Sequence, residues 1–188
     1  PATRMNPHLT YAQIRWGHKK NRGAQSGVIE MKDLYYAFDA MRLLQYFGVM
    51  SHDNMESLRV WFRDYLGWLI SSEQAVKEAQ AQNNHGTYYD LQVAAIAAFL
   101  DDHDTLYATF ARTEERVPLQ ISPTGIQYEE MTRSNTGHYC CFTLQGWLNL
   151  LNLAARYDGT LVQRVAEPGN PLRKAMEWLM AHEGFPWP

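Results

Sequence analysis

The sequence of 188 residues predicts an all-α fold, and three observations lead to this prediction. Apolar residues recur every three or four positions through most of the chain after residue 30, which is the helical period. The run YDLQVAAIAAFL at 89–100 is apolar on almost every side, as in a helix that is buried all round. No segment reads as a β-strand with hairpin turns. Amphipathic and fully apolar helices thus alternate, as in an inner ring of helices wrapped by an outer ring, although a generic helical bundle would give a similar pattern.

The first four helices are expected after an irregular, glycine-rich and basic opening. They span 31–50, 55–80, the apolar run at 89–100, and 103–116. The first two carry an apolar stripe along one face, formed by Leu34, Phe38, Met41, Leu44 and Phe47 in one and by Leu58, Phe62, Tyr65, Leu66 and Leu69 in the other. Such a stripe packs on a core and leaves the opposite face in water.

Two further helices complete the chain. The turn residues SPTG at 122–125 precede another apolar helix at about 138–156. The last helix lies within 170–184, where Asn170 is suited to cap its N-terminus, Pro171 to occupy its first position and Gly184 to follow its end. The length suits one sizeable core, so residues 1–188 are expected to form a single domain.

Charge is distributed unevenly along the chain. The first acidic residue is Glu30, whereas 5 of the 17 basic residues precede it (Arg4, Arg15, Lys19, Lys20 and Arg22). A basic arm on an acidic body is suited to contact a polyanion, and it is equally typical of a solvated loop. There is no basic helix or nucleic-acid-binding motif, and no stretch is long and apolar enough to span a membrane. The sequence thus predicts no nucleic-acid or membrane partner, and it leaves the oligomeric state open.

The two cysteines, Cys140 and Cys141, are adjacent in an apolar run. Neighbouring cysteines rarely pair with each other, and no metal-ligand spacing is present. We therefore expect two buried thiols, with no metal or other cofactor.

The stretch NNHGTYYD at 83–90 is the first candidate for chemistry. Thr87, with Asp90 three residues later, resembles a capping box that would start the apolar helix. Asn84 and His85 would then lie just before the helix N-terminus, where the helix dipole and free N–H groups favour an anion, and Gly86 would permit a tight backbone. The alternative is an ordinary turn, in which these side chains satisfy backbone groups.

The second candidate is RSNTGHYCCFTLQGW at 133–147. Arg133 is suited to bind a carboxylate through two parallel hydrogen bonds. Tyr139, at the start of an apolar helix, can exchange protons if cationic or donor groups stabilise its phenolate. A surface arginine and a half-buried tyrosine are the alternative interpretation.

Five stretches together resemble the alginate lyase superfamily of polysaccharide lyases, in the branch with an NNHGTWYD-like signature. They are MNPHLTYAQ at 5–13, GHKKNRGAQSGVIE at 17–30, WFRDYLGWLISSEQ at 61–74, NNHGTYYDLQ at 83–92 and the 133–147 segment. Tyr88 stands where the branch usually has Trp, and the sequence reads GHYCC where a serine usually follows the tyrosine. The family toroid usually has further helices before the MNP stretch, so the resemblance implies an incomplete (α/α) barrel or a fragment.

The resemblance implies a lyase that cleaves a 4-linked uronic-acid polymer, such as mannuronan or glucuronan, by β-elimination outside the cytoplasm, in a secreted or periplasmic location. It assigns Asn84, His85 and Arg133 to the uronate carboxylate and Tyr139 to proton transfer. Tyr139 alone can act as base and then acid where the C5 proton and O4 share a ring face, as in mannuronate. Where these groups lie on opposite faces, His85 is the natural second residue.

Neighbouring sugars are expected to contact residues in the opening segment and beside the proposed centre: Tyr11, Gln13, Arg22, Asn83, Tyr88, Tyr89 and His138. For Gln13 and Tyr89, helix packing is an equally good explanation. Two other functions remain open. One is a glycoside hydrolase that uses paired carboxylates among Asp101, Asp102, Glu129 and Glu130. The other is a non-catalytic helical module that binds carbohydrate or a protein partner.

Overall fold

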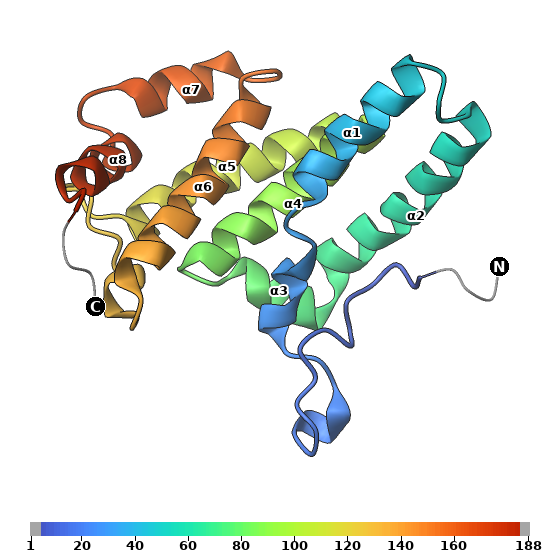
Figure 1. Cartoon of the computed structure of the whole chain (residues 1–188), viewed down its shortest axis with the longest axis horizontal. Helices are drawn as coiled ribbons and strands as arrows, with labels where there is room; N and C mark the ends of the chain where they lie inside the picture. Colours follow the sequence, from blue (N-terminus) through green and yellow to red (C-terminus); the bar gives the residue numbers. More distant parts are fainter. Residues whose placement is uncertain (1–4, 185–188) are drawn as a thin grey trace.

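The structure, a computed structural model, describes residues 5–184, apart from the side chain of Lys19. Arg4 of the basic opening lies outside the described residues. The α-helices are α1 Leu34–Tyr46, α2 His52–Ser71, α3 Glu73–Ala79, α4 Asn84–Leu100, α5 His103–Gln120, α6 Thr136–Ala154, α7 Gly159–Ala166 and α8 Pro171–Ala181 (Figure 1). Short 3-10 helices span Lys19–Asn21 (η1), Gln25–Met31 (η2) and Glu130–Thr132 (η3).

The predicted all-α class is confirmed. Residues 5–184 contain no β-strand, and Ile121 and Gln127 form only an isolated antiparallel bridge. No helix in this part of the chain has the length and apolar character needed to cross a membrane.

Several helix boundaries differ from the sequence prediction. The first helix begins only at Leu34, after η2, and the segment at 55–80 is divided into α2 and α3 at Ser72. Ser72 ends α2 in an extended conformation, and its side chain caps α3 by accepting a hydrogen bond from Ala75 N. The sequence prediction also missed α7, which is only 8 residues long and is capped by Asp158.

Helix α4 is the centre of the core. Residues 86–99 of this helix are all buried, and α4 contacts α1, α2, α3, α5 and α6. Figure 1 shows α4 between α1 and α2 on one side and α6, α7 and α8 on the other. Part of each predicted apolar stripe meets it, since the Phe38 ring lies 4.5 Å from the Phe99 ring and 4.7 Å from the Phe62 ring. Contrary to the prediction, Leu44 and Phe47 at the end of the first stripe are exposed. The prediction of a helix buried all round is therefore confirmed.

Thr87 does not cap this helix, contrary to the sequence prediction. The cap is Asn83, whose side-chain oxygen accepts a hydrogen bond from the His85 backbone N–H. Thr87 is buried within the helix, and its hydroxyl donates to Gln120 Oε1. Asparagine caps helices at least as well as threonine does, and with Asn83 as the cap the helix begins four residues earlier than predicted. Asn84 and His85 consequently lie in its first turn.

A buried ion-pair cluster joins α4 to α5. The Asp90 carboxylate is 0% exposed and accepts hydrogen bonds of 2.8 Å from Arg112 Nε and from Arg116 Nε. Arg116 also donates to the carbonyl oxygens of Ala79 and Ala81, at 2.8 and 2.7 Å. One guanidinium thus holds α4, α5 and the turn between α3 and α4 together.

Gly86 permits this close approach. A Cβ at this position would lie 2.1 Å from Ala81 O and 2.2 Å from Arg116 Nη1. Both neighbours belong to the cluster around Arg116, so neither can move without breaking a buried hydrogen bond.

We predict that Gly86→Ala displaces Arg116 and lowers the free energy of unfolding by roughly 3 kcal/mol or more, the range for disrupting a buried ion pair. Denaturant titration measures this change. The matched control is Gly67→Ala on α2, where the added Cβ meets no atom within 4 Å. That substitution is expected to raise stability by about 0.5–1 kcal/mol. Equal effects of the two substitutions would contradict the steric explanation.

The two cysteines have different environments, which corrects the expectation of two buried thiols. Cys140 is buried and Cys141 is exposed, because successive residues of α6 face in different directions. Burial, with smaller contributions from Glu130 and Cys141, raises the pKa of the Cys140 thiol to about 12.

We predict that a thiol-reactive disulfide reagent at pH 8 modifies one cysteine per folded chain and two in denaturant, because the thiolate is the reactive form. Absorbance of the released thiol measures the number. Cys141→Ser should leave no rapidly reacting thiol in the native protein, and rapid modification of that variant would contradict the assignment.

Candidate active site

One pocket of about 330 Å³ brings together all four residues predicted to be catalytic. Asn84 and His85 come from the start of α4, Arg133 from the segment before α6, and Tyr139 from the first turn of α6. Gln13 of the opening segment also lines the pocket. The sequence analysis did not identify the other lining residues, which are Ile29, Glu30, Lys32, Asp33 and Phe142.

Asn84 is held from behind by a buried glutamate. Its backbone N–H and its side-chain Nδ2 both donate to Glu130 Oε1, at 2.8 and 2.9 Å. Thr143 Oγ1 donates to the same oxygen at 2.9 Å, and Glu130 is 2% exposed. A carboxylate at a helix N-terminus is favoured by the helix dipole, so Glu130 fixes both the helix end and the orientation of the Asn84 amide.

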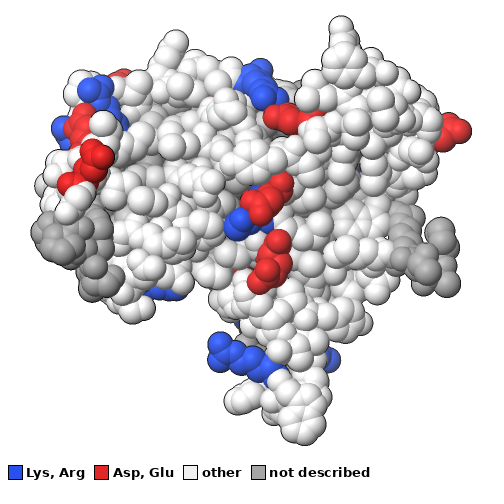
Figure 2. Space-filling view, in the orientation of Figure 1, with Lys and Arg blue, Asp and Glu red and all other residues white. Residues whose placement is uncertain are grey.

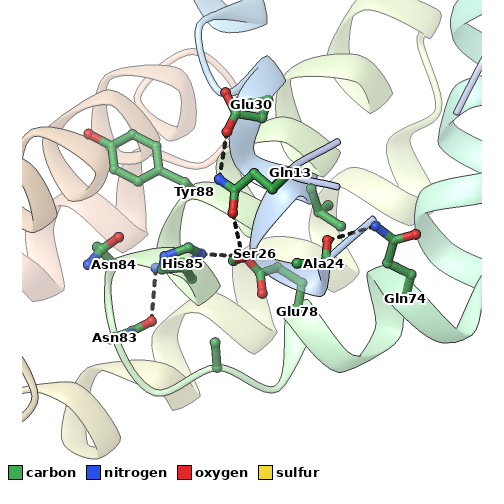
Figure 3. Close-up of polar contacts among 12 residues, drawn as sticks. Gln13, Ala24, Ser26, Glu30, Gln74, Glu78, Asn83, Asn84, His85 and Tyr88 are labelled. Atoms are coloured by element: carbon green, nitrogen blue, oxygen red, sulfur yellow. Dashed lines mark hydrogen bonds and ion pairs between the residues drawn. The ribbon is translucent and has the colours of Figure 1, made fainter. Parts of the chain in front are cut away.

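His85 is held in a similar way by Glu78. Its Nδ1 lies 2.5 Å from Glu78 Oε1, and the glutamate, in the last turn of α3, is 1% exposed (Figure 3). The His85 side chain is 21% exposed. Since one ring nitrogen faces the buried carboxylate, Nε2 is the nitrogen left for a ligand.

Arg133 and Tyr139 form a stacked pair. The guanidinium carbon lies 3.7 Å from the centroid of the Tyr139 ring, which is within the range of a cation–π interaction. Thr136 Oγ1 donates to the Arg133 carbonyl oxygen and fixes the turn between them. A positive group thus lies directly on the phenol that is expected to exchange protons.

The pocket wall opposite α6 comes from the opening segment and η2. Gln13 has a left-handed backbone, with φ of 53°, and its amide donates to Glu30 Oε1 at 2.6 Å while accepting a hydrogen bond from Ser26 Oγ (Figure 3). Gln74 of α3 donates to the Ala24 carbonyl oxygen and anchors this segment to the helices. The wall is therefore built by contacts between distant parts of the chain.

Charges around the pocket are mixed. Lys32 Nζ lies 2.8 Å from Asp33 Oδ1, and Glu30 and Arg133 add one charge of each sign. Figure 2 shows acidic and basic side chains interspersed on the face that it views, without a broad patch of one sign. The charged residues that line the pocket thus include both signs.

The residues predicted to bind neighbouring sugars are only partly brought together. Arg22 lines an adjoining hollow of about 330 Å³ that shares Gln13 with the main pocket. Tyr11 is 64% exposed, and its ring lies 5.6 Å from His8. His138 is exposed beside the pocket, with its ring nearly parallel to that of Phe142 at 6.1 Å.

The structure corrects the expectation that Tyr88, Tyr89 and Asn83 line the site, because each makes contacts within the fold instead. The Tyr88 hydroxyl donates to the Phe142 carbonyl oxygen and that of Tyr89 to the Leu69 carbonyl oxygen, and both rings are buried. Burial raises the pKa of both phenols. Figure 3 shows the Tyr88 ring directed away from Gln13 and Glu30. Asn83 caps α4 and is not among the lining residues.

The carboxylates considered for a glycoside hydrolase do not gather at this pocket. Asp101 pairs with Arg59 and Asp102 caps α5, both at the far end of α4 from His85. Glu129 is exposed outside the pocket, and Glu130 is occupied with Asn84. No set of three or more His, Cys, Asp or Glu side chains within residues 5–184 is arranged to hold a metal ion.

A second cavity, of about 260 Å³, lies between α5, α6, α7 and α8. Its walls are mainly apolar, with Phe110, Trp147, Leu150 and Leu161 among the lining residues. It lacks the convergent polar groups of the pocket at the start of α4, so the candidate active site is the pocket that contains His85 and Tyr139.

Comparisons with known proteins identify the family of the chain. A crystal structure of an alginate lyase from Bacteroides ovatus matches with a TM-score of 0.87 and 29% sequence identity, over 97% of this chain and 48% of that chain. The chain thus spans about half the length of the lyase that it matches, and its helical fold is that of an all-α toroid. No curated protein sequence gives a significant match. The model of the family described as alginate lyase matches residues 1–184, and the chain therefore belongs to the alginate lyase family.

Proposed function

We propose that this protein is a polysaccharide lyase that cleaves a 4-linked uronic-acid polymer by β-elimination. The observation that carries the proposal is the convergence of Asn84, His85, Arg133 and Tyr139 on one pocket. These residues supply amide, imidazole and guanidinium donors together with a phenol, which is the set of groups that the reaction requires.

The difficult step is removal of the proton from C5 of the uronate. This step builds negative charge onto a carboxylate that is already charged, so the enolate-like dianion must be stabilised. Preorganised donors do this, and the loss of one typically costs ~2.7–4 kcal/mol of barrier. Asn84 and His85 are held by buried glutamates, and Arg133 lies on the opposite side next to Tyr139. We assign these three residues to the carboxylate.

Tyr139 is the proposed base and acid. In mannuronate and glucuronate, the C5 proton and O4 lie on the same ring face, so a phenolate can take the proton and then return it to O4 as the C4–O4 bond breaks. The Arg133 guanidinium on the ring stabilises the phenolate. In guluronate the two groups lie on opposite faces, so a second residue is needed, and we assign this role to His85.

The substrate-binding surface is proposed to extend from the pocket through Gln13 toward Arg22. The shared lining residue and the basic character of the adjoining hollow, which also contains Arg15 and His18, support this direction. An anionic polysaccharide implies a protein that works outside the cytoplasm, and we propose a secreted or periplasmic location.

A second candidate function is a helical module that binds the polymer without cleaving it. It is favoured by length, because the chain covers 48% of the alginate lyase that it matches. Elimination creates a conjugated double bond that absorbs ultraviolet light, whereas binding and hydrolysis do not, so one assay separates the candidates.

We predict that Tyr139→Phe reduces elimination to the background rate, since no other phenol lines the pocket formed by the described residues. Ultraviolet absorbance of the product measures the rate, and circular dichroism checks that the variant is folded. Tyr46→Phe is the matched control, because Tyr46 is 81% exposed at the end of α1. Near-normal turnover by Tyr139→Phe would reject the assignment of the base.

We also predict that polymannuronate and glucuronan are cleaved faster than polyguluronate, since Tyr139 can serve both steps only when the proton and O4 share a face. The three polymers are compared at equal uronate concentration by the same absorbance. Faster cleavage of polyguluronate would show that two residues divide the proton transfers.

A further inference from the structure

The contact between His85 and Glu78 involves a residue to which no role has been assigned so far. Glu78 does not line the pocket, yet its carboxylate is buried behind the catalytic histidine and lies 2.5 Å from Nδ1. The turn that separates them is rigid, because Arg116 donates to the carbonyl oxygens of Ala79 and Ala81. The distance between the two side chains is thus set by the fold (Figure 3).

We propose that Glu78 is a positioning residue that selects the working form of His85. A carboxylate accepts hydrogen bonds, so the proton of the imidazole ring is held on Nδ1 and Nε2 faces the uronate. In the neutral ring Nε2 accepts a proton, and in the imidazolium it donates to the substrate carboxylate. The proposal rests on the lyase function proposed above, but the state of the ring can be measured without substrate.

Other charged groups also face His85, and their effect must be separated from that of Glu78. Arg133 and Tyr139 approach from the α6 side, and Arg116 lies behind the first turn of α4. The wall formed by η2 and the start of α1 contributes Glu30, Lys32 and Asp33. Glu78 differs from these groups because it alone is hydrogen-bonded to the ring in the described structure.

The proposal predicts the direction in which the pH–rate profile moves when Glu78 is replaced. Replacing Glu78 by glutamine removes a negative charge beside the imidazole, so the protonated ring becomes less favourable and loses its proton at lower pH. The limb of the pH–rate profile that reports His85 then moves to lower pH, whether the working form is the neutral base or the imidazolium. A purely structural contact would leave this limb in place.

The experiment compares wild-type protein, Glu78→Gln and Glu73→Gln on polymannuronate across the pH range. Glu73 is on the same helix, but its carboxylate is exposed and pairs with Lys77 at the surface. For Glu78→Gln, kcat is expected to fall about 10- to 100-fold, as for other carboxylates that orient a functional histidine, with a smaller change in KM and a shifted limb. Glu73→Gln should match the wild type. An unshifted limb in Glu78→Gln would overturn the proposal.

Two further measurements keep the test decisive. The ¹⁵N chemical shifts of the His85 ring in the free wild-type protein should show the proton on Nδ1, and a proton on Nε2 alone would overturn the proposal even if no variant folded.

Glu78→Asp keeps the charge on a shorter side chain, so it should lower kcat while leaving the limb near the wild-type position. A limb shifted as far as in Glu78→Gln would count against the proposal. Absence of elimination by the wild type would reject the lyase function and leave the ring measurement valid.

Discussion

The buried Asp90 carboxylate, held by Arg112 and Arg116, is the interaction on which the rest of this structure depends. Removing one partner from such a buried pair typically costs ~3–5 kcal/mol, because the other charge is left without compensation. Here the consequence would extend beyond stability. Arg116 also binds two carbonyl oxygens in the turn after α3, and this turn sets the distance between Glu78 and His85. A charge pair in the core therefore fixes the geometry of a pocket that it does not enter.

The pocket combines buried acids behind the donors with mixed charges at its mouth. Glu130 and Glu78 lie behind Asn84 and His85, and each fixes the orientation of the side chain in front of it. In the function that we propose, selectivity for an anion arises from the geometry of a few donors. This suits a site that must stabilise the extra charge of an enolate-like intermediate, since a broad positive surface would bind the ground state equally well.

The sequence was sufficient for the helical class, for most helices and for the four residues at the centre of the pocket, because the segments around them carry recognisable motifs. The sequence was insufficient where tertiary contacts determine which residue caps a helix or which side chains are buried. Asn83 and Thr87 are both residue types that cap helices well. Only the contact of Thr87 with Gln120 inside the core shows that Thr87 is not the cap. The position of Tyr88 and Tyr89 in the motif suggested that their side chains are exposed at the site. Both lie in a helix that is buried all round, and both side chains are buried. Glu78 lies in an amphipathic run, where an acid is usually solvated.

The left-handed backbone at Gln13 has a consequence for how this wall of the pocket is maintained. A side chain with a Cβ in this conformation costs roughly 1–2 kcal/mol relative to the right-handed region, and glycine would adopt it freely. Glycine, however, lacks the amide that links Ser26 to Glu30. Backbone conformation and the link across the wall thus favour different residues at position 13, and the glutamine provides the link at the cost of local backbone strain.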